Sequence, residues 1–150
     1  MWKDKLQEIV QEKEIYKEKL NIGVLEKDIE KFLIEFKKEF SVEFPREILP
    51  ILKVVNGLEF NGFILYGLDQ YLLQDKLNQS VYGFIEYNKI WHENSWQKKY
   101  LFIGESNISW YVYDFGKLEY FELDNPSGEI IKSFDSIEWL VENVLCDSLA

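Results

Sequence analysis

Apolar residues recur at helical spacing in two stretches before residue 41. In the first, residues 2–20, the stripe consists of Trp2, Leu6, Ile9, Tyr16 and Leu20, and Lys13 interrupts it. In the second, residues 25–40, the stripe consists of Ile29, Phe32, Leu33, Phe36 and Phe40. The pattern predicts two amphipathic helices, the first of them ended by Asn21 and Gly23. A coiled-coil dimer is the alternative for the first helix, but its short length and seam lysine favour packing within one domain.

The stretch from Phe44 to Gly67 predicts a short helix followed by a turn and a strand. Pro45 fits a first helical turn, and Asn56-Gly57 fits a helix end. The apolar face between them consists of Ile48, Leu49, Ile51, Leu52 and Val55. Pro50 removes one helical hydrogen bond, so a kink or a late helix start is expected there. Asn61-Gly62 predicts a tight turn that leads into a strand near residues 63–66.

Residues 68–99 show no long regular period. A short helix from about Val81 to Trp91 is one interpretation, and a loop with a single helical turn is the other. The segment is rich in aromatic residues, among them Trp91 and Trp96. Such side chains suit the edge of a protein interface, and they equally suit a lid on the core.

Residues 100–131 alternate between apolar and polar positions, as strands do. The pattern predicts strands at 100–103, 108–113 and 118–123 and a short one at 129–131, with turns at 114–116 and 124–128. Consecutive strands with short turns form an antiparallel meander. Ser133 is predicted to cap a last helix, with Asp135 and Ser136 in its first turn. Its core face would consist of Phe134, Ile137, Leu140, Val141, Val144 and Leu145.

These elements predict one α+β domain over residues 1–150, with N-terminal helices and a C-terminal helix packed on a mostly antiparallel sheet. The length of 150 residues fits a single domain, and 47% hydrophobic residues are too many for a disordered chain. The single cysteine, Cys146, cannot form an internal disulfide, which favours a reducing compartment. No export signal or membrane span is apparent, so a cytoplasmic location is expected.

The sequence offers little catalytic chemistry. His92 is the only histidine, which removes most metal sites and histidine-based triads, and a surface or boundary position is expected for it. Cys146 is expected to be a small buried side chain of the last helix. No phosphate-binding glycine pattern occurs, so no cofactor or metal is predicted. Carboxylates are dense after residue 100, and a hydrolase that uses two of them stays open, although no pattern singles out an acid–base pair.

The negative charge is concentrated in the last third of the chain. The formal net charge is −10, and residues 101–150 contribute 10 acidic and only 2 basic side chains, a sum of −8. Such a surface repels nucleic acid and anionic lipid and attracts basic partners. A solvated acidic face that only aids solubility is the alternative.

Several short motifs occur in an order that resembles a known superfamily. They are Phe44-Pro45 with Leu49, the Asn56-Gly57 helix end, Phe63-Ile-Leu-Tyr-Gly67, Leu101-Phe-Ile-Gly104, Trp110-Tyr-Val-Tyr-Asp114 and Ser133-Phe134. This order resembles the SUKH superfamily, which includes the Smi/Knr-type cell-wall-synthesis regulators of fungi and many bacterial toxin-immunity proteins. The run from Asn56 to Gly67 and the segment from Ile85 to Trp91 look most like its YrhA-type subgroup. The similarity covers about residues 24–145.

The resemblance implies helices packed on one mixed or antiparallel sheet, no catalysis and, in bacteria, an immunity protein that neutralises a toxin domain, often a nuclease or deaminase. The matching positions are expected to maintain the fold; they are Pro45, Leu49, Asn56, Gly57, Tyr66, Gly104, Trp110, Ser133 and Phe134. The sequence departs from the family pattern at Pro50 and in the Trp- and Asn-rich segment 82–96, which is where partner specificity could lie.

Charge and resemblance together suggest a partner-binding surface. We expect Glu119, Glu122 and Asp124 to contact a basic toxin face, and Trp91 and Trp96 to provide desolvated anchors. The chain is expected to be monomeric and to bind neither nucleic acid nor membranes. The alternative from another class is a regulatory or scaffold module without a toxin partner, as in the fungal relatives.

Overall fold

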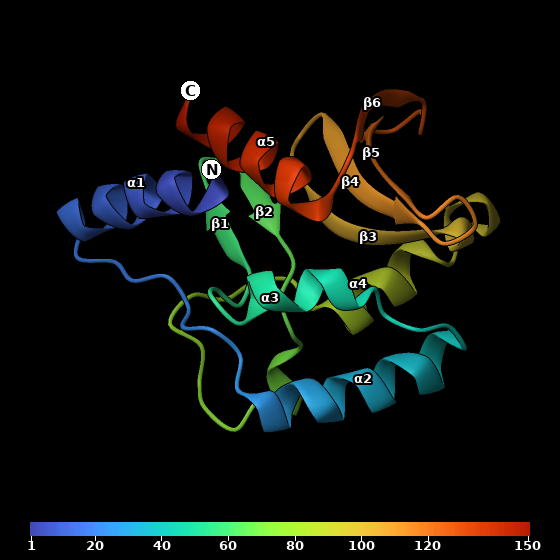
Figure 1. Ribbon diagram of the computed structural model, residues 1–150, viewed down its shortest axis with the longest axis horizontal. Coiled ribbons are helices and arrows are strands. Elements are labelled where there is room, and N and C mark those ends of the chain that lie inside the picture. The colour runs from blue at the N-terminus through green and yellow to red at the C-terminus, as the bar shows by residue number, and fades with distance from the viewer.

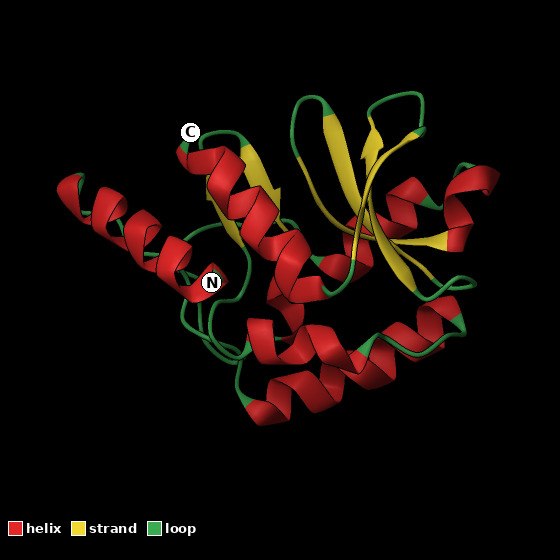
Figure 2. Cartoon of the chain, turned by 45° about the horizontal axis from the view of Figure 1, so that its top comes forward, coloured by secondary structure: helices red, strands yellow, loops and turns green.

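The computed structural model describes residues 1–150 and has the predicted α+β architecture. Six strands form one antiparallel sheet whose spatial order is the sequence order, a meander (Figures 1 and 2). The strands are β1 (Leu58–Phe60), β2 (Phe63–Leu65), β3 (Tyr100–Glu105), β4 (Ser109–Asp114), β5 (Glu119–Asp124) and β6 (Ile130–Phe134). The α-helices are α1 (Trp2–Ile15), α2 (Glu26–Phe40), α3 (Leu49–Leu52), α4 (Phe84–Trp91) and α5 (Ile137–Leu149). Three short 3-10 helices cover Arg46–Ile48, Gln70–Leu72 and Ser95–Lys99.

Helices cover both faces of the sheet. The first and last helices, α1 and α5, lie side by side, although they are far apart in the sequence (Figure 1). On the opposite face, Trp91 of α4 stacks on Phe102 of β3, with ring centroids 5.5 Å apart. Helix α2 forms an outer layer, because its Phe32 ring packs 6.1 Å from Phe84 of α4 rather than on a strand. The core therefore continues through four layers, from α5 through the sheet to α4 and then α2.

The first helix is shorter than the spacing of its apolar residues predicts. It ends at Ile15, and Tyr16 is 73% exposed, so the prediction of a helix to residue 20 is wrong. Lys13 does not interrupt the buried stripe but belongs to it, since its aliphatic stem is buried and its ammonium lies 5.8 Å from the Phe60 ring centroid. A lysine whose stem packs and whose charge faces a ring can occupy such a boundary position.

The segment after Pro45 holds less helix than predicted. A 3-10 turn comes first, and α3 then ends at Leu52, four residues before Asn56. Pro50 lies in the first turn of α3, where its missing N–H costs nothing, so the expected late start is correct. Asn56 does not close the helix. Its buried Oδ1 accepts a hydrogen bond from the Leu68 N–H at 2.7 Å, which ties β1 to the chain beyond β2.

The Asn61-Gly62 turn is confirmed, with φ of 49° and 83°, and it joins β2 to a short strand, β1, that the sequence did not predict. The outer edge of β1 is closed by a side chain. Gln79 accepts from the Glu59 N–H at 3.1 Å and donates to the Glu59 carbonyl at 3.0 Å. The side chain of Asn21 holds Gln79 in turn. Its Oδ1 accepts from the Gln79 N–H at 2.7 Å, and its Nδ2 donates to the Gln79 carbonyl at 2.9 Å.

The short helix in the irregular segment is confirmed, although it starts at Phe84 rather than Val81. Two polar side chains, one from the helix itself and one from outside it, fix its position and its start. The fully buried amide of Asn88 accepts from the Phe102 N–H at 2.7 Å and donates to the Phe102 carbonyl at 3.0 Å, as a neighbouring strand would. Asp69 accepts from the N–H groups of Ile85 and Glu86, both at 2.9 Å, and so caps the helix.

The meander from residue 100 is confirmed, but the start of the last helix is not where the sequence suggested. Ser133 lies in β6, so the prediction that it caps α5 is wrong. The cap is Ser136, whose Oγ accepts from the Trp139 N–H at 3.3 Å. The misprediction arose because the last strand continues to Phe134, three residues further than its apolar run indicated. The apolar face of α5 is buried as predicted from Ile137 onward, whereas Cys146 is only half-buried.

Candidate functional site

A hollow of about 510 Å³ opens where the β4–β5 turn, the end of β6 and the start of α5 meet. Its walls come from three separate parts of the chain and consist of Glu47, Leu118, Glu119, Tyr120 and residues 133–138. We call it the acidic hollow, since its lining includes four carboxylates and no lysine or arginine; they are Glu47, Glu119, Asp135 and Glu138. The charge excess of the last third of the chain is thus partly gathered around one concave surface.

The four carboxylates are not neutralised by neighbouring cations. None of them takes part in an ion pair, although ion pairs form elsewhere, for example between Lys37 and Glu43 at 2.7 Å. Some other hollows carry both signs; the one beside α4, for instance, is lined by Glu86, Lys89 and Glu93. Unpaired charges of one sign in a concave site strengthen the local potential, which favours a cationic partner.

Tyr120 fixes the floor of the acidic hollow. Its hydroxyl donates to Glu47 at 3.0 Å, which joins β5 to the 3-10 turn before α3. Burial, followed by the hydrogen bond to Glu47, raises the pKa of Tyr120 far above its ordinary value. Tyr120 therefore stays a neutral donor, and Glu47 keeps one carboxylate oxygen for another contact.

Two of the hollow's carboxylates also have a role in the fold. Asp135 and Glu138 flank the cap residue Ser136, at the positive end of the α5 dipole. Negative side chains are favourable there even without a partner. Glu119 has no such role, because it lies at the exposed start of β5.

Leu118, at the rim of the hollow, has an unusual backbone. It is 69% exposed and has φ +57°, in the left-handed region that favours glycine. Its N–H donates to the Asp114 carbonyl at 2.8 Å and closes the β4–β5 turn. A large apolar residue in this conformation costs the fold free energy and gains little burial in return.

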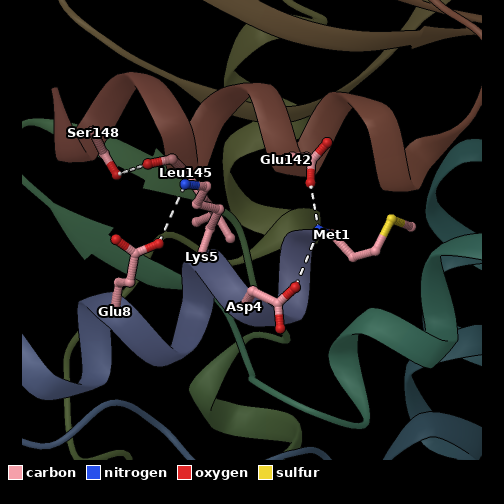
Figure 3. Close-up of polar contacts among 7 residues, drawn as sticks. All are labelled: Met1, Asp4, Lys5, Glu8, Glu142, Leu145 and Ser148. Carbon is pink, nitrogen blue, oxygen red and sulfur yellow. Dashed lines mark hydrogen bonds and ion pairs between the residues drawn. The ribbon is translucent and has the colours of Figure 1, made fainter.

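A second hollow, of about 380 Å³, adjoins the first between β6 and α5. The two share Ser133, Phe134 and Asp135, so together they form one groove along β6. The second hollow is less negative, because its lining includes Lys132 and because Glu142 lies 3.1 Å from the α-ammonium of Met1, which also contacts Asp4 at 3.2 Å (Figure 3). Trp139 lies over this part of the groove and is 55% exposed.

Of the three carboxylates proposed from the sequence, the structure places only Glu119 in the acidic hollow. Glu122 accepts a hydrogen bond from the Ser109 hydroxyl at 2.7 Å, and Asp124 accepts from the Ser127 N–H at 3.2 Å in the next turn. Strand alternation also turns Glu119 to one face and the other two to the opposite face. The three therefore do not form one surface.

The two tryptophans proposed as anchors do not line the acidic hollow. Trp91 is half-buried, and its Nε1–H donates to the Tyr66 hydroxyl at 2.9 Å. Trp96 is 43% exposed and packs against Gly128 and Trp110. The structure thus separates Trp91 and Trp96 from the acidic hollow.

Sequence reasoning missed most of the groove; the missed residues are Glu47, Leu118, Asp135, Glu138 and Trp139. Glu47 reaches the hollow through a contact between residues 73 positions apart, which no local pattern reveals. No local signal marked Leu118, because the turn from Asp114 contains Gly116, the residue expected to take a positive φ, whereas the structure places the positive φ at Leu118.

The remaining chemical candidates lie elsewhere. His92 Nε2 is 2.7 Å from the Tyr100 carbonyl and its ring packs on Phe40, a boundary position as expected. Histidine, cysteine and acidic side chains nowhere form a group of three that could hold a metal ion. None of the helices has both the length and the apolar character needed to cross a membrane.

No protein-family model matches the chain, and no curated protein matches its sequence. The SUKH resemblance therefore remains a prediction, and the function has to be inferred from the groove.

Proposed function

We propose that this chain is a non-catalytic, cytoplasmic protein-binding domain that acts as a bacterial immunity protein, binding and neutralising a basic toxin domain. The observation that carries the proposal is the acidic hollow, with four carboxylates and no basic side chain in its lining. Nuclease toxins need a basic groove for nucleic acid, so an unpaired acidic surface is complementary to them.

Exposed apolar side chains next to the hollow add to this support. Leu118 and Trp139 are 69% and 55% exposed and lie at two points of the same groove. Apolar anchors inside a ring of charge are the usual source of interface affinity, whereas the charges provide orientation and speed. The groove offers both components on one surface.

The proposal predicts that charge reversal in the hollow weakens partner binding. The partner is first captured from a lysate of the source cell with the tagged wild-type chain and identified by mass spectrometry. We expect the double variant Glu119→Lys and Glu138→Lys to bind it at least about tenfold more weakly at low salt, and the difference to shrink at high salt. Isothermal titration at two salt concentrations measures both effects.

The matched control is Glu14→Lys with Glu18→Lys, which makes the same charge change on exposed positions of the α1 segment. Equal losses in both double variants would mean that only net charge matters and that the hollow is not the site. Co-expression then tests immunity, because the wild-type chain should restore growth to cells that produce the captured partner. A partner that binds in the groove without harming those cells would favour a regulatory module instead.

A further inference from the structure

The two edges of the sheet are not equivalent. At β1, the outward N–H and C=O of Glu59 are both occupied by the Gln79 side chain, at 3.1 and 3.0 Å. At β6, no hydrogen bond of residues 130–134 involves a backbone group outside the pairing with β5, and four of the five residues are exposed. One edge is closed to further strands and the other is open.

The register shows which backbone groups are open. The Asp124 N–H donates to the Glu129 carbonyl at 2.8 Å, so Asp124 faces the last strand. Glu122 pairs with Lys132 and Tyr120 pairs with Phe134 in the same ladder. By the alternation of antiparallel hydrogen bonds, Lys132 and Phe134 turn their backbone groups inward, and Ser133 turns its N–H and C=O outward.

The devices that usually protect an edge do not cover Ser133. A lysine commonly blocks an edge by its charge, but here Lys132 Nζ donates to Asn143 on α5 at 2.8 Å and so is directed onto the helix. The register shift of β6 lies at its beginning, between the partners of Glu122 and Leu123, which leaves Lys132–Phe134 regular. Ser133 itself is small and exposed.

From this we infer that β6 receives an extended, basic segment of the partner protein as a seventh strand, paired through Ser133. The basic nature follows from the position of the edge, since Ser133, Phe134 and Asp135 also line the acidic hollow. A strand added at β6 would run directly past carboxylates that form no ion pair. A second copy of this chain is the less suitable occupant, because pairing two β6 strands would bring two acidic hollows together.

This inference rests on the proposed function for the nature of the partner, but it can be tested without the partner. The probe is a synthetic peptide of alternating lysine and valine, compared with the same sequence N-methylated at every second residue. Methylation leaves the charge and the side chains unchanged and removes the N–H groups along one edge. We expect the unmethylated peptide to bind the wild-type chain about tenfold more tightly, since methylation removes the N–H that would donate to the Ser133 carbonyl and puts a methyl group against the edge.

On the protein side, the variant is Ser133→Pro, which removes the outward N–H and no bond to β5. Its matched control is Ser133→Thr, which keeps the N–H and suits a strand. We expect the proline variant to bind the unmethylated peptide about tenfold more weakly than the wild-type chain does, because a peptide carbonyl loses its donor, and the threonine variant to bind it as the wild type does. In the wild type, the Ser133 amide should become protected from hydrogen exchange when the peptide is added, which a purely structural role of Ser133 would not produce.

Three results would overturn the inference. The first is failure of the unmethylated peptide to bind the wild-type chain. The second is equal binding of both peptides that is lost only with Glu119→Lys and Glu138→Lys; charge alone would then attract the peptide, and the proposed function would stand without strand addition. The third is sedimentation of the free chain as a dimer that Ser133→Pro dissociates, because the edge would then belong to a second copy. If Ser133→Pro does not fold, the methylated peptide still decides between the first two results.

Discussion

At the scale of single residues, Leu118 at the rim of the groove lowers the stability of the fold. A leucine with φ +57° and 69% exposure gains almost nothing from the fold in return for its strained backbone. Glycine would adopt the same conformation without strain. The fold itself therefore gives no reason for a leucine at this position.

We predict that Leu118→Gly stabilises the free protein and weakens partner binding. The free energy of unfolding should rise by about 0.5–1 kcal/mol, since the relief of strain exceeds the entropy that glycine loses. Urea unfolding and titration with the partner measure the two effects. The control is Ile108→Gly, a residue with similar exposure, 70%, and no positive φ, which should gain no stability. A loss of stability in Leu118→Gly, or an unchanged affinity, would contradict this reading of Leu118.

At the scale of elements, α4 owes its position to side chains that are not its own core face. Asp69 caps its start, Asn88 replaces a strand partner of Phe102, and His92 at its end reaches the first residue of β3. The apolar spacing of residues 81–91 could predict that a helix exists, because spacing is a local property. It could not predict where the helix docks, because these polar contacts join residues that are distant in sequence. The same limit applies to α1. The apolar spacing continues beyond Ile15, but spacing alone cannot show that the helix has no core surface to cover beyond that residue.

The contact at the end of α4 predicts a pH dependence of stability. Burial lowers the pKa of His92 below its ordinary 6.5, despite the hydrogen bond to the Tyr100 carbonyl. As the pH falls below 6.5, the unfolded chain takes up a proton before the folded chain does. The free energy of unfolding should therefore fall as the pH decreases through this range, and the stabilising contribution is complete only above it.

Comparison with His92→Gln isolates this effect, because the glutamine amide can still donate to the carbonyl but does not titrate. His92 is the only histidine, so the difference between the two proteins reports on it alone, while the carboxylates affect both equally. Urea unfolding at several pH values between 7.5 and 5 should show a steeper loss in the wild type. Parallel curves would mean that burial does not alter the titration of His92.

At the scale of the whole molecule, the charge is distributed so that it can guide association. The net charge of −10 repels a second copy, and the acidic hollow provides a local focus for a basic partner. The sequence was sufficient to find the excess in the last third and to name Glu119. It could not assemble the hollow, because Glu47 comes from the first third and strand register decides which of Glu119, Glu122 and Asp124 share a surface.

We predict that salt acts mainly on the rate at which the partner binds. Raising the salt from about 50 mM to about 500 mM should lower the association rate constant at least about tenfold, and should change the dissociation rate constant much less, because charges guide the encounter over distances that salt screens. Stopped-flow mixing of the chain with its captured partner measures the association rate. A salt effect on the dissociation rate constant alone would contradict this prediction, because the charges would then act within the bound interface and not during the encounter.

Gln79 has a consequence for the state of the protein at high concentration. If both edges of a sheet are open, the last strand of one molecule can pair with the first strand of the next. Such head-to-tail growth has no natural stop. Because one glutamine amide occupies Glu59 at the β1 end, this sheet can be extended at one end only. A single side chain thus separates a protein that accepts one guest strand from one that could polymerise into filaments.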